Sequence, residues 1–209
     1  MADTLTLTPE QLFFLGILMD AQYIDYAYIA SLQEIRRNYT RTRRKCLSEL
    51  AELGVLRERL SGEITLRPGP KQLLSNLFFG KDQSSLEVYT LGKKMSHSVF
   101  RFHRLGDAVT RVSTEDGRLA LSQSSPEEME QLVSALVRGI EQPMSVIAIE
   151  KGAVTRIITA KHATVDVGST GCVLFEQPGG LYTVDENGKP VALPASQARR
   201  LILSELKGE

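Results

Sequence analysis

Cysteine and histidine are scarce in this sequence of 209 residues, which contains two cysteines and three histidines. Cys46 and Cys172 lie too far apart to form a CxxC redox or zinc motif, and we expect both to be small core residues. The histidines, His97, His103 and His162, lack the HxxxH and HExxH spacings that bring two imidazoles to one metal ion. The sequence therefore predicts no metal centre.

The glycine-rich and nucleophile motifs of common enzymes are also missing. The chain has no GxxxxGKS or GxxxxGKT phosphate loop, no GxGxxG dinucleotide fingerprint and no GxSxG elbow. Pro178-Gly179-Gly180 is too short to hold a phosphate and predicts a turn. Acidic residues such as Glu127 and Glu128 fall at an expected helix start, where carboxylates are usual. We therefore expect no catalytic residue, no cofactor and a non-enzymatic function.

A charge excess and a long apolar run are absent as well. The 25 basic residues balance 25 acidic ones, so the whole molecule has no excess charge that attracts it to nucleic acid or to an anionic membrane. The longest apolar run, Leu12 to Met19, is far shorter than the roughly 20 residues of a membrane-spanning helix. Met1 to Thr4 lack the basic start of a signal peptide. The sequence predicts a cytoplasmic protein without a membrane partner.

A helical segment is expected over residues 1–70. Thr8 is suited to cap a helix, with Pro9 at the first helical position and Gln11 three residues after the cap. The apolar spacing predicts helices at about Leu12–Met19, Ile24–Leu32 and Thr40–Leu53, a cap at Gly54, and a hairpin of Val55–Glu58 with Glu63–Leu66. Three helices followed by a hairpin is the element order of a winged helix.

The rest of the chain, residues 85–139 and 144–209, has the pattern of short strands followed by a helix. Each half contains a strand, a glycine four residues later, a hairpin turn, an Ala-Leu pair and a helix. The strand Val99–Phe102 of the first half corresponds to Cys172–Phe175 of the second half. The hairpin turn Asp116-Gly117 corresponds to Asn187-Gly188. Further strands are expected at Val146–Ile149 and Val154–Ala160. This weak repeat predicts an α+β fold in which two related halves share one central antiparallel sheet.

One local charge feature stands out against the neutral total. The segment from Ile35 to Lys45 has no acidic residue and six basic ones, Arg36, Arg37, Arg41, Arg43, Arg44 and Lys45. In a winged helix this segment would lie at the start of the recognition helix, and its cations would contact DNA phosphates. Alternatively, it is a solvated helix face whose cations pair with Glu34, Glu49 and Glu52.

Three parts of the sequence resemble the EspG-type chaperones of type VII (ESX) secretion systems. They are the opening Leu7-Thr8-Pro9-Glu10-Gln11, the helix end from Leu47 through Leu50 to Leu53-Gly54-Val55-Leu56, and a C-terminal series. That series contains Ala163-Thr164-Val165-Asp166-Val167-Gly168, then Pro178-Gly179-Gly180, then a closing helix from Ala198 to Leu206. The chain differs from the family in being shorter, and its second half lacks a helical segment equivalent to Gln11–Leu53.

The resemblance implies a single domain over residues 1–209, with a pseudo-twofold α+β fold around a central antiparallel sheet. It also implies a function without catalysis, in which the protein binds a helical secreted substrate and keeps it soluble until export. No binding residue of the family transfers to this chain, because no motif matches at the contact positions.

Candidate partner-binding residues therefore come from strand alternation. If Phe100 and Phe102 point into the core, Arg101 and His103 point to the opposite face of an open sheet. We expect the same surface to include three further residues, so that the set is Arg101, His103, Arg111, Arg156 and Ile158.

Two named functions remain open on the sequence alone, together with a third class that covers any other interaction or an enzymatic role. One is a protein-binding secretion chaperone, and the other is a winged-helix transcriptional regulator with a C-terminal sensing domain. An exposed apolar patch on the sheet or on the closing helix would favour the chaperone. A separate N-terminal part with Arg41, Arg43 and Arg44 exposed on one side would favour the regulator.

Overall fold

The computed structural model describes residues 4–30, 32–61, 63–138, 141, 144, 145, 149, 152–164 and 168–208. The chain divides into two compact units that are not contiguous in sequence. The first unit comprises Met1–Gly80 and His103–Gln123, and the second comprises Lys81–Phe102 and Ser124–Glu209. Strand β5 (Ser96–Leu105) contributes residues to both units.

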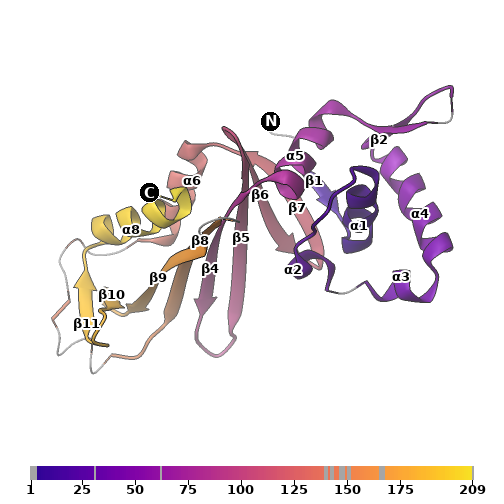
Figure 1. The fold of residues 1–209 in the computed structure, drawn as a ribbon. Helices are drawn as coiled ribbons and strands as arrows, with labels where there is room; N and C mark the ends of the chain where they lie inside the picture. The colour runs from indigo at the N-terminus through magenta and orange to yellow at the C-terminus, as the bar shows by residue number, and fades with distance from the viewer. Residues whose placement is uncertain are drawn as a thin grey trace. The chain divides into compact units, whose positions relative to one another are not determined.

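The first unit is mainly helical (Figure 1). Its elements are β1 (Leu5–Leu7), α1 (Pro9–Leu18), α2 (Tyr26–Ile29), α3 (Gln33–Arg37), α4 (Tyr39–Glu52), β2 (Leu56–Glu58), β3 (Ile64–Leu66), α5 (Pro68–Phe79), β6 (Ala108–Glu115) and β7 (Arg118–Ser124). Strand β1 pairs antiparallel with β7, so that Leu5 lies opposite Leu121. Strands β2 and β3 form a separate antiparallel hairpin.

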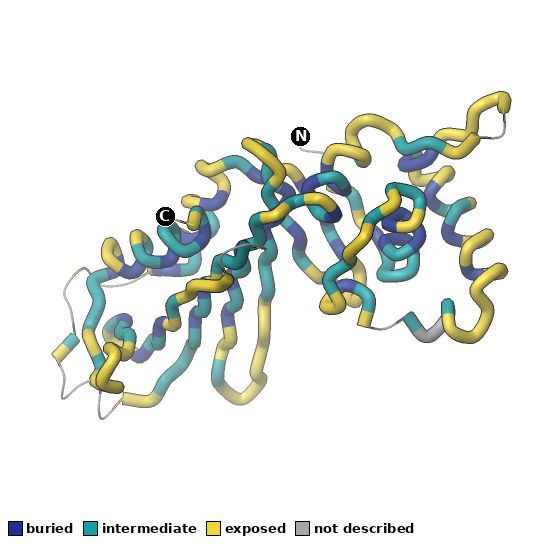
Figure 2. The backbone as a smooth tube through the Cα atoms, in the orientation of Figure 1, coloured by how far each residue is buried: buried dark blue, intermediate teal, exposed yellow. Residues whose placement is uncertain are grey.

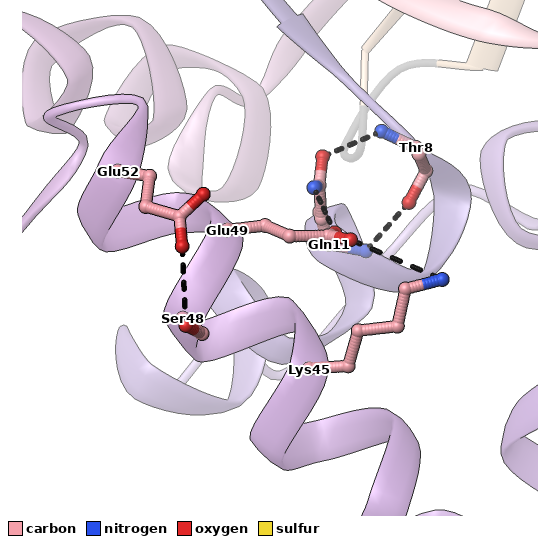
Figure 3. Close-up of polar contacts among 6 residues, drawn as sticks. All are labelled: Thr8, Gln11, Lys45, Ser48, Glu49 and Glu52. Atoms are coloured by element: carbon pink, nitrogen blue, oxygen red, sulfur yellow. Dashed lines mark hydrogen bonds and ion pairs between the residues drawn. The ribbon is translucent and has the colours of Figure 1, made fainter.

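Helix α1 begins as the sequence predicts. The Thr8 hydroxyl accepts a hydrogen bond from the Gln11 backbone, and the Gln11 side chain accepts one from the Thr8 backbone, which completes a capping box. The same Gln11 side chain donates to Glu49 of α4 at 2.9 Å, and Lys45 lies 3.9 Å from Glu49 (Figure 3). This small network connects the start of α1 to α4.

The spacing of buried residues along α4 shows which side of this helix packs inward. Thr42, Cys46 and Leu50 are buried at four-residue intervals, and buried and exposed segments alternate along this helix in Figure 2. Leu50 joins a core that also includes Leu12, Leu74 and further apolar residues of α1, α5 and β7. The first unit therefore has its own hydrophobic core.

The second unit is built on a large antiparallel sheet, so the chain is α+β. Its elements are β4 (Asp82–Thr90), α6 (Pro126–Leu136), β8 (Arg156–Thr164), β9 (Gly168–Gln177), β10 (Gly180–Val184), β11 (Pro190–Leu193) and α8 (Ala195–Lys207). The strand order within this unit is β5-β4-β8-β9-β10-β11. Strands β4 and β8 pair along nine residues each, from Asp82 opposite Thr164 to Thr90 opposite Arg156.

Helix α8 covers one side of this sheet. Its contacts are with β4, β8, β9 and β10, and its buried residues are Ala195, Ala198, Ile202 and Leu206. On the strands, Leu86, Ala160 and Leu174 are fully buried on the same side. The Ser84 hydroxyl donates to the Leu206 carbonyl oxygen at 2.7 Å, which fixes the C-terminal end of α8 over β4.

The element order repeats as expected, since four strands and a helix (β4 to β7, then α6) are followed by four strands and a helix (β8 to β11, then α8). The Asp116-Gly117 turn has positive φ at both residues, as predicted for this hairpin. The pseudo-twofold relation of the halves, the winged-helix comparison and the single domain over 1–209 stay predictions.

Two sequence expectations about elements differ from the structure. The helix predicted at Ile24–Leu32 is shorter, because the Asp25 carboxylate accepts from the Ala27 backbone and starts α2 at Tyr26, and α2 ends at Ile29. The strand predicted at Val146–Ile149 lies outside the described residues except for Ile149, which is helical.

Gly80 provides a test of packing in the first unit. A Cβ atom at this position would lie 2.4 Å from the Asn76 carbonyl oxygen and 2.6 Å from that of Arg104. Because backbone atoms cannot move aside easily, Gly80→Ala should lower the free energy of unfolding by about 1–3 kcal/mol. Gly92→Ala is the matched control, since a Cβ there meets no atom within 4 Å. Urea unfolding of both variants measures the difference, and equal stabilities would contradict the described end of α5.

Candidate functional site

The side of the second unit's sheet opposite α8 is the first candidate surface, and we call it the open face. Because side chains alternate along strands, the residues next to the buried ones point to this side. Cross-strand pairing arranges them in two rows, Tyr89 with Ile157, Phe175 and Tyr182, and Glu87 with Thr159 and Val173. All seven remain partly or well exposed.

The first row of the open face is apolar and aromatic. Phe175 and Tyr182 stack with their ring centroids 5.1 Å apart, and Ile157 lies between Tyr89 and Phe175 in the register. Tyr89 is 36% exposed, and Val173 of the neighbouring second row is 40% exposed. Partly exposed aromatic side chains on adjacent strands form the kind of surface that anchors a protein partner.

A polar cluster borders this row. The Tyr89 hydroxyl donates to Glu87 at 2.8 Å, and His97 Nε2 lies 3.2 Å from the same carboxylate. The Tyr89 and His97 rings stack at a centroid distance of 4.0 Å. The cluster thus holds an aromatic ring pair and a carboxylate in fixed positions beside the apolar row.

These contacts change the pKa of the Glu87 carboxyl group and the pKa of the Tyr89 hydroxyl group. Burial raises the pKa of Glu87, but the hydrogen bonds from Tyr89 and His97 and the charges of His97 and Arg101 outweigh it, so its pKa is lowered. The hydrogen bond to Glu87, with smaller contributions from burial and from the charge of Glu87, raises the pKa of Tyr89. Glu87 is therefore ionised and Tyr89 neutral at physiological pH.

The hairpin between β4 and β5 extends beyond the cluster. Lys93, Lys94 and Met95 are exposed at its turn, and Met95 is 80% exposed. A flexible apolar side chain beside two cations adapts well to a partner surface.

The structure separates the five residues that strand alternation had grouped. Arg101 is half-buried and its charge acts on Glu87, which places it with the polar cluster of the open face. Arg111 is half-buried in β6 of the first unit.

Ile158 and Arg156 belong to the side of the sheet that α8 covers, so the expectation for them is wrong. Ile158 is fully buried because its cross-strand partners, Val88 and Leu174, point to the same covered side. The guanidinium of Arg156 forms an ion pair with Glu176 and also donates to the Leu136 carbonyl oxygen. Its role is to hold the end of α6 near β8 and β9.

His103 is also misassigned. It is 5% exposed, and its Nε2 lies 2.6 Å from the Tyr28 hydroxyl of α2. Since Phe102 is buried as well, both sides of β5 are covered at this point. A partner cannot reach His103 in this structure.

Sequence reasoning missed the apolar row itself. Tyr89, Phe175 and Tyr182 were each assigned to strands, but only the register shows that they meet on one side. The usable signal was the alternation Leu86-Glu87-Val88-Tyr89, in which every second residue is polar or carries a hydroxyl.

The second candidate surface is the basic side of α3 and α4. Arg36, Arg37, Arg41, Arg43, Arg44 and Lys45 are all exposed. Of the acidic partners expected for them, Glu49 pairs with Lys45, and Glu52 accepts from Ser48 (Figure 3). The side chain of Glu34 lies outside the described part of the structure. Among the described side chains, none forms an ion pair with the five arginines.

The described residues contain no group of three or more histidine, cysteine, aspartate or glutamate side chains placed to hold a metal ion. None of their helices has the length and apolar character needed to cross a membrane.

The fold of this chain is similar to that of the type VII secretion system chaperone EspG5 of Mycobacterium tuberculosis, whose structure was solved in complex with a PE25-PPE41 dimer. The two structures match with a TM-score of 0.65 and 9% sequence identity, over 98% of this chain and 97% of the other. At that identity the likeness is one of fold. No protein-family model and no curated protein sequence matches this chain.

The polar cluster on the open face generates a pH prediction. Glu87→Gln removes the negative charge beside Tyr89, so the pKa of Tyr89 should fall towards its ordinary value of 10.0. NMR titration of the tyrosine rings measures this change. Glu186→Gln, at an exposed turn, is the control that should leave the pKa of Tyr89 unchanged.

The same variant should alter stability in acid. Because the pKa of Glu87 is lowered from 4.5, its stabilisation is present above that value and is lost as the pH falls through the lowered pKa. The stability difference between the original protein and Glu87→Gln should therefore shrink at acid pH. A difference that is constant with pH would contradict the described contacts.

Proposed function

We propose that this chain is a cytoplasmic chaperone of a type VII secretion system, which binds a helical secreted protein through the open face of its second unit. The observation that carries the proposal is the partly exposed apolar row of Tyr89, Ile157, Phe175 and Tyr182. The fold likeness to a chaperone of this class, over nearly the full length of both chains, supports the choice of partner.

A helix would bind the open face beside its Gln177 end, where Gln177 is buried and donates to the carbonyl oxygens of Ile149 and Gly152. On its other side, the same sheet already packs against α8 through Ala198, Ile202 and Leu206. A twisted antiparallel sheet can receive a second amphipathic helix in the same way, and the apolar row supplies anchors on β4, β8, β9 and β10. Glu87, His97 and Arg101 would then form a polar rim that selects the partner's orientation.

A chaperone role follows from the physics of such a contact. A secreted protein that exposes an apolar tip aggregates before export, because that surface is unfavourable in water. Covering the tip with the open face removes the apolar surface of both proteins from water. No bond is made or broken, so the proposed function needs no catalytic residue.

Val173 provides the sharpest test, since it is an exposed valine on the open face, two residues from Phe175 on β9. Val173→Lys would place a charge in the proposed interface, and we expect at least about a tenfold weaker complex, because a buried unpaired charge is costly. The measurement is co-expression with each helical secreted protein encoded beside this gene, followed by affinity co-purification and titration calorimetry of the complex found.

Val191→Lys is the matched control. Val191 is 42% exposed, against 40% for Val173, and it is also on a strand, but its register with Thr183 places it on the α8 side. The Val191→Lys variant should bind the partner with the same affinity as the unchanged protein. An equal loss of affinity in both variants, or no loss of affinity in Val173→Lys, would exclude the open face as the docking site. Absence of any complex with such proteins would overturn the chaperone function itself.

A further inference from the structure

We propose that the N-terminal half of α4, together with the arginines of α3, is a binding surface for duplex DNA. The surface lies in the first unit and is distinct from the open face. Its cations are Arg36 and Arg37 on α3, and Arg41, Arg43, Arg44 and Lys45 on α4. It gives the protein a second binding activity besides the proposed chaperone function.

The geometry of α4 presents these cations outward. Thr42, Cys46 and Leu50 are buried, so the inward side of the helix is fixed by packing. Arg41 and Arg44 are three residues apart and lie on the opposite side, with Arg43 and Lys45 on its flanks. The helix therefore exposes a basic stripe along its first half.

Charge distribution along α4 restricts the surface to that half. Its acidic residues, Glu49 and Glu52, lie in the second half, where Glu49 is held by Gln11 and Lys45 and Glu52 by Ser48. No acidic residue occurs between Ile35 and Lys45, which gives this segment a charge of six positive units. A polyanion is the complementary partner for such a concentration of charge, because binding it releases condensed counterions.

Duplex DNA fits this surface better than duplex RNA. The major groove of B-form DNA admits an α-helix, whereas that of A-form RNA is too deep and narrow. The element order provides a second point of support, since α4 is followed by the β2–β3 hairpin as a recognition helix is followed by a wing. A hollow on that hairpin is lined by Arg57, Arg59 and Arg67. Arg59 pairs with Glu63, and Arg57 and Arg67 can contact backbone phosphates beside the groove.

The test is fluorescence anisotropy of the full-length protein with a labelled random-sequence DNA duplex of roughly two helical turns. Six phosphate contacts predict that the logarithm of the affinity falls with the logarithm of the salt concentration with a slope of about −5, measured between about 50 and 200 mM salt. Replacing Arg41, Arg43 and Arg44 by Gln should reduce the slope by about 3 and weaken binding on the order of a hundredfold at about 0.1 M salt.

The matched control removes three exposed positive charges from the second unit, by Lys81→Gln, Lys189→Gln and Arg200→Gln. It should retain the DNA affinity and slope, and circular dichroism verifies that both triple variants are folded. Equal losses in the two variants, or no salt-dependent binding by the original protein, would overturn the proposal. Equal affinity for duplex RNA, or tighter binding to a polyglutamate peptide of matched charge, would also overturn it, the latter in favour of an acidic protein partner.

Discussion

The pairing of β4 with β8 is the constraint on which the second unit depends. Nine consecutive residue pairs fix the register between two strands that are separated by more than sixty residues of sequence. Because side chains alternate, this register decides at once which residues pack under α8 and which form the open face. A shift by one residue would expose Leu86 and Val88 and turn Glu87 and Tyr89 towards α8. The open face and the hydrophobic core are therefore two results of one register.

Local signals predicted the elements well, because they act over a few residues. Thr8 completes the expected capping box, and the Asp116-Gly117 turn follows from the positive φ that both residues tolerate. The candidate site depends on contacts between residues that are far apart in the sequence. Ile157 and Ile158 are identical in chemistry and adjacent in sequence, yet one lies on the open face and the other is fully buried. Nor can the sequence show that His103 would meet Tyr28, which is 75 residues away.

The two candidate surfaces rely on different physical forces. On the open face, affinity would come from apolar area removed from water, which salt weakens little. On α3 and α4, affinity would come from counterion release, which salt weakens steeply. Ionic strength can thus separate the two activities in one sample.

The basic stripe on α3 and α4 has a colloidal consequence for a molecule with no net charge. The whole chain has 25 positive and 25 negative groups, so the six positive units of residues 35–45 leave the remaining residues with an excess of six negative units. Each molecule therefore offers a concentrated positive region to the negative surface of its neighbours, with no net repulsion to keep them apart near the sequence pI of about 6.9. Weak self-attraction should consequently limit how far the protein can be concentrated in dilute buffer, and added salt should raise that limit.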